Sequence, residues 1–130
     1  MHKTKSPKKN RRRVRNQPLH RNRKKLNVSL SADLREKHGI RNLPVRKGDV
    51  VSLIKGKDTL IGEKKRVMTV STSKMKLQID GVKLNKTDGT EVLRWVSPAN
   101  IKIVQLGKVD QFRQKIIDRR KEAREKIVNS

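Results

Sequence analysis

The amino-terminal part of this chain carries far more positive charge than a folded interior can hold, and this limits where a core can lie. Residues 1–47 contain 17 Lys and Arg residues against only two acids, and the first 25 residues contain three large apolar side chains. Ordering a residue costs about 1–2 kcal/mol in backbone entropy, which so little apolar surface does not offset. We therefore expect residues 1–28 to form an extended basic arm that is disordered without a partner.

The charge of the whole chain indicates the kind of partner. A formal charge of +24 on 130 residues opposes compaction unless a polyanion neutralises it. Nucleic acid is the first candidate, and an anionic membrane surface is the second. The sequence has no apolar run of the roughly 18 residues that span a membrane and no apolar signal-peptide stretch, so we expect a soluble intracellular protein.

The middle of the chain has the period-two pattern of β-strands. In KMKLQID, Met75, Leu77 and Ile79 alternate with polar residues. Asp88-Gly89 is a hairpin signal, because these residues tolerate the positive φ of a tight turn. The strands are expected at Val50–Ile54, Arg66–Ser71, 74–80, Gly81–Lys86, Glu91–Val96 and Ile101–Gln105. Five or six short strands in about sixty residues predict a mainly β fold, a small antiparallel barrel over residues 45–107.

A short helix and a linker are predicted over residues 29–44. Ser29 or Ser31 is suited to cap the helix, and Gly39 suits the left-handed residue that ends it. We expect three apolar side chains to anchor this segment and the arm to the domain: Leu30, Leu34 and Ile40.

A basic helix is predicted over residues 108–130, with Asp110 as its cap. Apolar residues at helical spacing form its expected buried stripe: Val109, Phe112, Ile116, Ala123 and Ile127, with Ile117 beside them. Arg113 is expected on the charged surface. The pattern leaves open whether this helix covers the barrel, RNA or a neighbouring protein.

The sequence contains no pattern that is typical of catalysis. His2, His20 and His38 lie in separate segments, no cysteine is present, and the phosphate-loop motif GxxxxGK[ST] is absent. The acids are scattered and form no conspicuous pair. We expect no enzymatic activity, no cofactor and no metal.

The basic residues instead suit contacts with RNA phosphates. Arginine grips phosphate with two parallel hydrogen bonds, and glycine lets the backbone approach closely. The candidates in the arm are Arg11, Arg12, Arg13, Arg15, His20, Arg21, Arg23, Lys24 and Lys25. The candidates in the barrel are Arg46, Lys47, Gly48, Lys55, Gly56, Lys57, Lys64, Lys65 and Arg66. We expect Lys47, Lys55 and Lys57 to project from loops at one end of the barrel.

The scarcity of aromatic residues indicates how RNA is recognised. Trp95 and Phe112 are the only aromatic residues, so the chain lacks a platform for stacking single-stranded bases. We interpret Trp95 as a packing residue of the core or hairpin. Recognition is expected to depend on phosphates, 2′-hydroxyls and the shape of folded RNA.

Two segments resemble a known family. LPVRKGDVVSLIKG, at residues 43–56, resembles the start of a KOW motif, which is found in small SH3-like barrels. The upstream PLHRNRKKLNVSLSADLREKHGIRNLPVRKGD is similar to the archaeal and eukaryotic branch of the universal large-subunit ribosomal protein numbered twenty-four in bacteria and twenty-six in eukaryotes. The resemblance runs from about Pro18 to Arg124. The family usually has a glycine just before the second KOW strand, where this chain reads GEKKRVMTV.

The resemblance implies a structural constituent of the large ribosomal subunit that binds folded large-subunit rRNA near its 5′ region. It also implies a role in early subunit assembly and a position near the polypeptide exit tunnel. The RNA contacts that it implies are residues 18–25, Arg46, Lys47, Gly48 and the Lys55–Lys57 turn. The expected partners are large-subunit rRNA and neighbouring ribosomal proteins, with no homo-oligomer. The expected location is the cytoplasmic ribosome, with nuclear and nucleolar passage in a eukaryote. Two alternatives stay open, an architectural nucleic-acid-binding protein and a KOW-type transcription elongation module.

Overall fold

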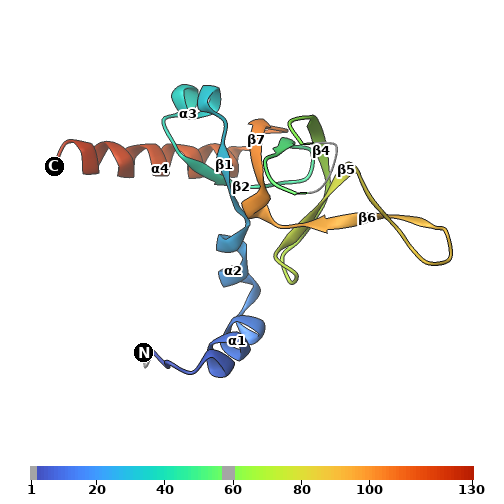
Figure 1. Cartoon of the computed structure of the whole chain (residues 1–130). Helices are drawn as coiled ribbons and strands as arrows, with labels where there is room; N and C mark the ends of the chain where they lie inside the picture. Colours follow the sequence, from blue (N-terminus) through green and yellow to red (C-terminus); the bar gives the residue numbers. More distant parts are fainter. Residues whose placement is uncertain (1–2, 57–60) are drawn as a thin grey trace.

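The computed structural model describes residues 3–56 and 61–130, and its centre is one twisted β-sheet (Figure 1). In the described residues, seven strands follow one another in the order β2-β1-β7-β3-β4-β5-β6. Helices lie at both ends of the chain. The predicted class, mainly β with flanking helices, is confirmed, and the sheet is consistent with an SH3-like fold.

The strands and their pairings differ from a closed antiparallel barrel. The bounds are β1 Asn27–Leu30, β2 Asn42–Pro44, β3 Val50–Leu53, β4 Lys64–Ser71, β5 Lys76–Asn85, β6 Glu91–Val96 and β7 Ile101–Gln105. Among the described residues the sheet is open, with β2 and β6 at its edges. The pairing of β1 with β7 is parallel, whereas the other strand pairs are antiparallel. The parallel pair arises because the segment before the predicted barrel adds two strands of its own.

The hydrophobic core explains why those two strands belong to the sheet. Val28 and Leu43, which face each other across β1 and β2, are 0% and 1% exposed. They join Val51, Ile79 and Ile103 in one buried cluster. A domain of about sixty residues buries only about 60% of its unfolded surface, so apolar residues from outside residues 45–107 enlarge a small core.

Most predicted strands occur close to their predicted positions, with one merger. β6 and β7 have the predicted bounds, whereas the predicted strands at 74–80 and 81–86 form the single long β5. Gly81 has a φ of +82°, and the pairing of β5 with β6 shifts between Gln78 and Lys83. This glycine therefore accommodates an irregularity within one strand and does not separate two strands. The hairpin at Asp88-Gly89 joins β5 to β6 as predicted, with Gly89 at a φ of +91°.

The predicted short helix is α3, Ala32–His38. It begins after Leu30, which lies in β1 instead. Ser31 is the residue at its amino end, although its side chain makes no capping hydrogen bond, and Ser29 lies in β1. Gly39 ends the helix in the left-handed conformation, as predicted. Leu30 and Ile40 are buried, and Leu34 packs partly buried against the core.

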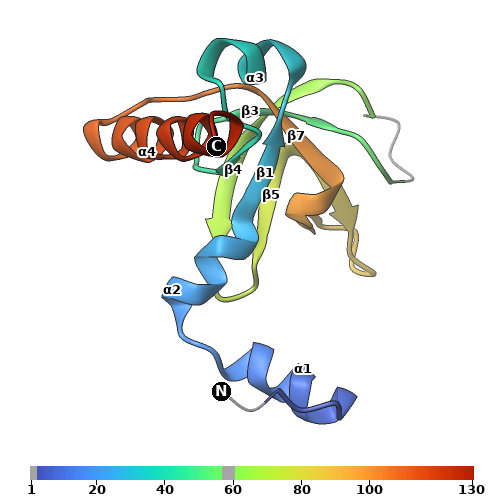
Figure 2. The same cartoon turned by 90° about the vertical axis from the view of Figure 1, so that its left-hand side faces the viewer.

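The amino-terminal arm is helical, which corrects the prediction of an extended segment. It contains α1, Pro7–Asn16, then α2, Leu19–Asn22, and the 3-10 turn η1, Arg23–Leu26. Pro7 at the first turn suits a helix start, and Lys and Arg have good helix propensity. No residue of α1 is buried, so the composition argument against a core in this arm remains valid. The arm extends away from the sheet on the side of the turn between β4 and β5 (Figure 2).

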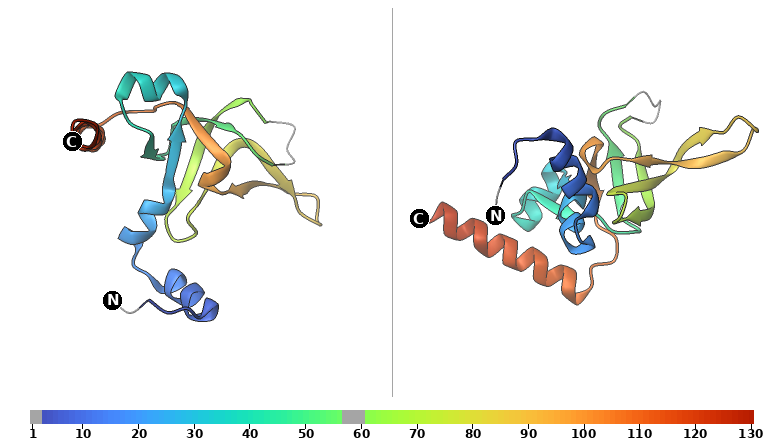
Figure 3. Two further views of the ribbon diagram at one scale, coloured as in Figure 1. Left: turned by 60° about the vertical axis from the view of Figure 1, so that its left-hand side comes forward. Right: turned by 90° about the horizontal axis from the view of Figure 1, so that it is seen from below.

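Helix α4, Gln111–Val128, lies beside β1, β2 and the end of α3 (Figures 2 and 3). Arg120 bonds to Asn42 and Asn27, and Arg124 donates to the carbonyl of Gly39. The carboxyl end of α4 projects beyond the sheet, and the β5–β6 hairpin projects on the opposite side (Figure 1). A further 3-10 turn, η2 at Pro98–Asn100, precedes β7.

Candidate nucleic-acid interface

The first group of candidate residues lies on α1, and it presents positive charge in several directions. Arg11, Arg12, Arg13 and Arg15 are all exposed. Successive residues of an α-helix point about 100° apart, so three consecutive arginines cover more than half of its circumference. Helix α1 therefore presents cations around most of its surface, while Asn10 and Val14 line a hollow shared with Ser73 and Met75 of the turn between β4 and β5.

The second group lies on α2 and η1, where two buried residues fix the backbone. Asn22 and Leu26 are 4% and 3% exposed, and the backbone N–H of Val45 donates to the carbonyl of Leu26 at 3.1 Å. Gln17 donates a side-chain hydrogen bond to Asn22. The basic residues of this group are exposed around that anchor: His20, Arg21, Arg23, Lys24 and Lys25.

The arm has no internal source of neutralising charge. The first acidic residue of the chain is Asp33, beyond α1, α2 and η1. Within residues 3–56 and 61–130, no arm residue forms an ion pair. An external anion would therefore meet cations that are already solvated and available.

The third group lies in the turn before β3, and a buried carboxylate holds this turn. Gly48 has a φ of +94°, a conformation that side chains with a Cβ rarely adopt, and its N–H donates to the carbonyl of Val67 on β4. Asp49 is 0% exposed and accepts a hydrogen bond from the N–H of Arg46 at 3.0 Å. Lys47 is exposed at the tip of the turn.

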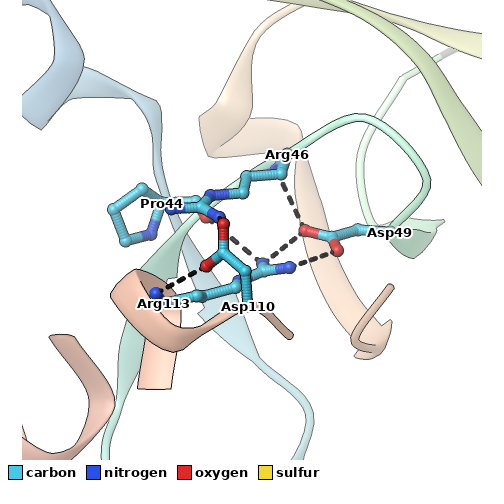
Figure 4. Close-up of polar contacts among 5 residues, drawn as sticks. All are labelled: Pro44, Arg46, Asp49, Asp110 and Arg113. Carbon is cyan, nitrogen blue, oxygen red and sulfur yellow. Dashed lines mark hydrogen bonds and ion pairs between the residues drawn. The ribbon is translucent and has the colours of Figure 1, made fainter. Parts of the chain in front are cut away.

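Arg113 of α4 is the ionic partner of Asp49, which corrects its predicted place on the charged surface (Figure 4). Its Nη1 donates to Asp49 Oδ1 at 2.7 Å and its Nη2 to Oδ2 at 2.6 Å. Nη2 also lies 3.4 Å from the carbonyl of Pro44. Arg113 is 1% exposed, so the pair is fully removed from water and forms the bidentate geometry that suits guanidinium and carboxylate.

A second set of bonds joins the start of α4 to the same turn. Asp110 accepts from the backbone N–H of Arg113 at 2.7 Å, and Arg46 Nη1 donates to the other carboxylate oxygen at 2.9 Å. The first of these bonds lowers the pKa of Asp110, and Arg46 adds to the effect. Arg46 is therefore partly engaged within the protein, and Lys47 is the freer cation of this turn.

Gly107 makes the junction of β7, α4 and the turn possible. Its N–H donates to Asp49 Oδ1 at 2.8 Å. A Cβ at this position would lie 2.9 Å from the carbonyl carbon and oxygen of Gly48. This arrangement was not predicted; its one signal in the sequence is that Asp49 is the only acid between Glu36 and Asp58 in a basic stretch.

The fourth group does not lie where it was expected. Lys47 precedes β3 and Lys55 follows it, so the two residues lie at opposite ends of one strand, and the expectation of a single shared end is wrong. A strand extends its chain in one direction, so loops before and after it separate. Gly56 is exposed beside Lys55, and Lys57 lies outside the described residues.

The basic residues at the start of β4 are likewise divided between the two ends of β3. Arg66 pairs with Val50 near the Lys47 end, and Lys64 pairs with Ser52 toward the Lys55 end. Lys65 Nζ forms an ion pair with Glu63 Oε2 at 3.4 Å. Lys64 and Arg66 are exposed. The candidate residues therefore form separate basic regions on the arm and at two ends of β3.

Trp95 is engaged in a contact within the protein. Trp95 of β6 is half-buried, with Lys74 Nζ from the turn between β4 and β5 lying 4.5 Å from its ring centroid, so its ring packs against that turn. The described residues contain no group of three or more potential metal ligands. Within that part of the chain, no helix has the length and apolarity that crossing a bilayer requires.

The sheet, the basic arm and the anchored terminal helix together define a small, strongly basic β-protein with surface-exposed cationic extensions. The chain belongs to the family of ribosomal proteins that comprises eukaryotic L26 and its archaeal counterpart, which is numbered twenty-four; the family model matches residues 4–120. This membership confirms the resemblance seen in the sequence and the prediction of a non-enzymatic protein.

Curated relatives extend over most of the chain. The large ribosomal subunit protein uL24 of Sulfurisphaera tokodaii is 34% identical over 113 residues, which cover 87% of this chain and 82% of the relative. The protein of the same name from Haloarcula marismortui is 38% identical over 111 residues, 85% of this chain and 91% of the relative. A third uL24, from Picrophilus torridus, is 46% identical over 82 residues, 63% of this chain and 52% of the relative.

Proposed function

We propose that this protein is a structural constituent of the large ribosomal subunit that binds folded large-subunit rRNA. Its relatives carry the name of a large-subunit protein. The observation that carries the RNA part is the arm. No carboxylate occurs before Asp33, and the candidate Arg, Lys and His side chains there are exposed.

The physical mechanism is neutralisation of phosphate. Each contact releases condensed counterions, so affinity falls with salt by a log–log slope of about 0.7–0.9 per contact. In this proposal the arm enters between RNA helices, while Lys47, Lys55, Lys64 and Arg66 contact phosphates around the sheet. Binding in the native state also adds stability to a small domain by mass action.

The wider role that we propose is early assembly of the large subunit near the polypeptide exit tunnel, in contact with neighbouring ribosomal proteins. The protein would act in the cytoplasmic ribosome, with nuclear and nucleolar passage in a eukaryote. We further propose four functional divisions: a basic arm over residues 1–28, a linking segment over 29–44, a KOW-type region over 45–107 and a basic tail over 108–130. Strands β1 and β2, which belong to the first two divisions, complete the sheet of the third.

Competition binding tests the RNA proposal. At fixed salt, a labelled folded large-subunit rRNA fragment is displaced by unlabelled rRNA fragment or by duplex DNA with the same number of phosphates. We expect the rRNA fragment to compete at least about tenfold better, because exposed cations at set positions around the sheet match one folded shape. Equal competition by DNA would contradict this proposal and favour an architectural nucleic-acid-binding protein.

A further inference from the structure

A basic cleft lies between the α2–η1 segment and the middle of α4, parts of the chain that are far apart in the sequence. Its volume is ≈ 240 Å³. The basic residues that line it come from both walls: His20, Arg23, Lys24, Arg119 and Arg120. The two arginines of α4 were not among the candidate residues of the sequence, because the cleft exists only where the arm and the terminal helix meet.

The cleft has unbalanced positive charge. No carboxylate is among its lining residues, which otherwise are Asn27, Pro44 and Ile116. None of the five basic residues forms an ion pair with an acid in residues 3–56 or 61–130. An anion that enters the cleft would therefore gain attraction without displacing an internal partner.

Arg120 is held in position by hydrogen bonds that use only part of its N–H donors. Its Nη1 donates to the backbone and side-chain oxygens of Asn42, both at 2.9 Å, and its Nη2 donates to Asn27 Oδ1 at 3.2 Å. A guanidinium has five N–H donors, so two remain without an acceptor in the described part of the chain. Partial burial, and then the adjacent charge of Arg119, lower the pKa of Arg120, which agrees with a cation that lacks a counter-charge.

Both walls of the cleft are fixed to the core before any ligand binds. Leu26 anchors η1 and is 3% exposed, and Ile117 anchors α4 and is 2% exposed. A site whose walls are already positioned loses little conformational entropy on binding. The cleft is therefore a preformed site.

We propose that this cleft binds one segment of RNA sugar–phosphate backbone, with Lys24, Arg119 and Arg120 as its phosphate contacts. The inference rests on the proposed function and names a site for it. Arginine pairs match the geometry of phosphate oxygens, and the η1 wall continues directly into the basic arm. An acidic peptide is less suited, because its backbone amides need acceptors and Asn27 is the only amide side chain that lines the cleft.

The test compares two double variants that each remove two positive charges. K24Q/R119Q alters the cleft, whereas K115Q/K126Q alters exposed residues of α4 outside it. Affinity for a folded large-subunit rRNA fragment is measured from about 50 to 200 mM NaCl, after circular dichroism has shown that both variants fold. We expect K24Q/R119Q to reduce the log–log slope by about 1.4–1.8, the value for two lost phosphate contacts, and K115Q/K126Q to reduce it by less than half of that.

A third variant separates charge from geometry. R119K keeps the charge but loses the planar fork, so we expect an affinity between those of wild type and K24Q/R119Q. Equal losses in the two double variants would overturn the cleft, because they would indicate general attraction alone. Unchanged RNA affinity in K24Q/R119Q would also overturn it and favour a protein occupant.

The proposed function is judged separately. It depends on the preference of the wild-type protein for rRNA over duplex DNA, whereas the cleft depends on the difference between the two double variants on one RNA. Loss of rRNA preference with a retained difference would refute the function and keep an anion site. Preference for rRNA without a difference would refute the cleft alone.

Discussion

At the scale of single residues, the buried pair of Asp49 and Arg113 joins the turn before β3 to α4. The carboxylate accepts from the turn at Arg46, from the strand end at Gly107 and from α4. It thereby connects this turn to two segments that lie far from it in the sequence. A buried pair contributes little net stability relative to apolar residues, but losing one partner leaves a charge without compensation.

Replacement of Asp49 by Asn tests this connection. We expect D49N to reduce the free energy of unfolding by about 3–5 kcal/mol, because the Arg113 guanidinium stays buried without its counter-charge. Urea denaturation followed by circular dichroism measures the change. E91Q, which breaks the exposed pair of Lys83 and Glu91, is the control and should cost far less.

A double replacement decides the case in which D49N does not fold. D49N/R113M removes both charges but keeps a side-chain oxygen at residue 49 that can accept from the N–H of Gly107, so we expect it to recover much of the lost stability. A loss below about 1 kcal/mol in D49N would show that Arg113 finds water or another acceptor, and would contradict the role given to this pair.

At the scale of elements, α4 shows how a correct helix can have the wrong face assigned. Its predicted stripe included Phe112 and Ile127, which are 68% and 74% exposed. The face that meets the sheet does carry Ile116 and Ile117, as predicted, but Arg113 and Arg120 complete it. The helical spacing correctly predicted that this segment is a helix. It did not predict the whole of the buried face, because two arginines that bond to the sheet region lie on that face.

The start of α4 gives this element a pH dependence. The hydrogen bond from the Arg113 N–H holds the pKa of Asp110 below its ordinary value of 3.8. A carboxyl group with a lowered pKa stabilises the folded state above its unfolded value, and this contribution disappears as the pH falls through the folded value. We expect D110N to lower Tm at about pH 7, and the difference from wild type to shrink below about pH 3.8.

Thermal unfolding of wild type and D110N at about pH 7, 5 and 3 measures this effect. D118N changes an acid further along α4 that accepts from Gln114, and it serves as the control. A difference between wild type and D110N that is the same at all three pH values would contradict an electrostatic origin.

At the scale of the whole molecule, charge is distributed around a neutral core. The arm, both ends of β3 and the terminal helix carry exposed cations, while buried apolar residues gather in one cluster. With a net charge of +24, repulsion between the basic side chains destabilises the folded state of the free protein.

Simple salt should therefore stabilise the free protein. We expect Tm to rise by several degrees between about 10 and 200 mM NaCl, since the Debye length falls from about 30 Å to below about 10 Å over this range. Differential scanning calorimetry without RNA measures the change. A Tm that is constant or falls with NaCl would show that internal ion pairs outweigh repulsion.

How much of this structure the sequence predicts depends on how local each cause is. The alternation in β6 and β7, the hairpin at Asp88-Gly89 and the cap at Asp110 depend on neighbouring residues, and all were predicted. Strands β1 and β2 were not predicted. β1 pairs with the distant residues Lys102 and Ile103 and is too short to show a clear alternating pattern.

The sequence by itself determined that the basic, acid-poor stretch up to Lys25 supplies no apolar core, that a small β-sheet lies in the middle of the chain, and that the chain suits a polyanionic partner. These conclusions depend on composition and on spacing between near neighbours. Only the tertiary structure decided that Asp49 meets Arg113, that Lys47 and Lys55 lie at opposite ends of β3, and that η1 and α4 enclose a basic cleft. Such pairings depend on which distant segments come together, and in a chain with 36 basic residues any acid or cleft has many possible partners.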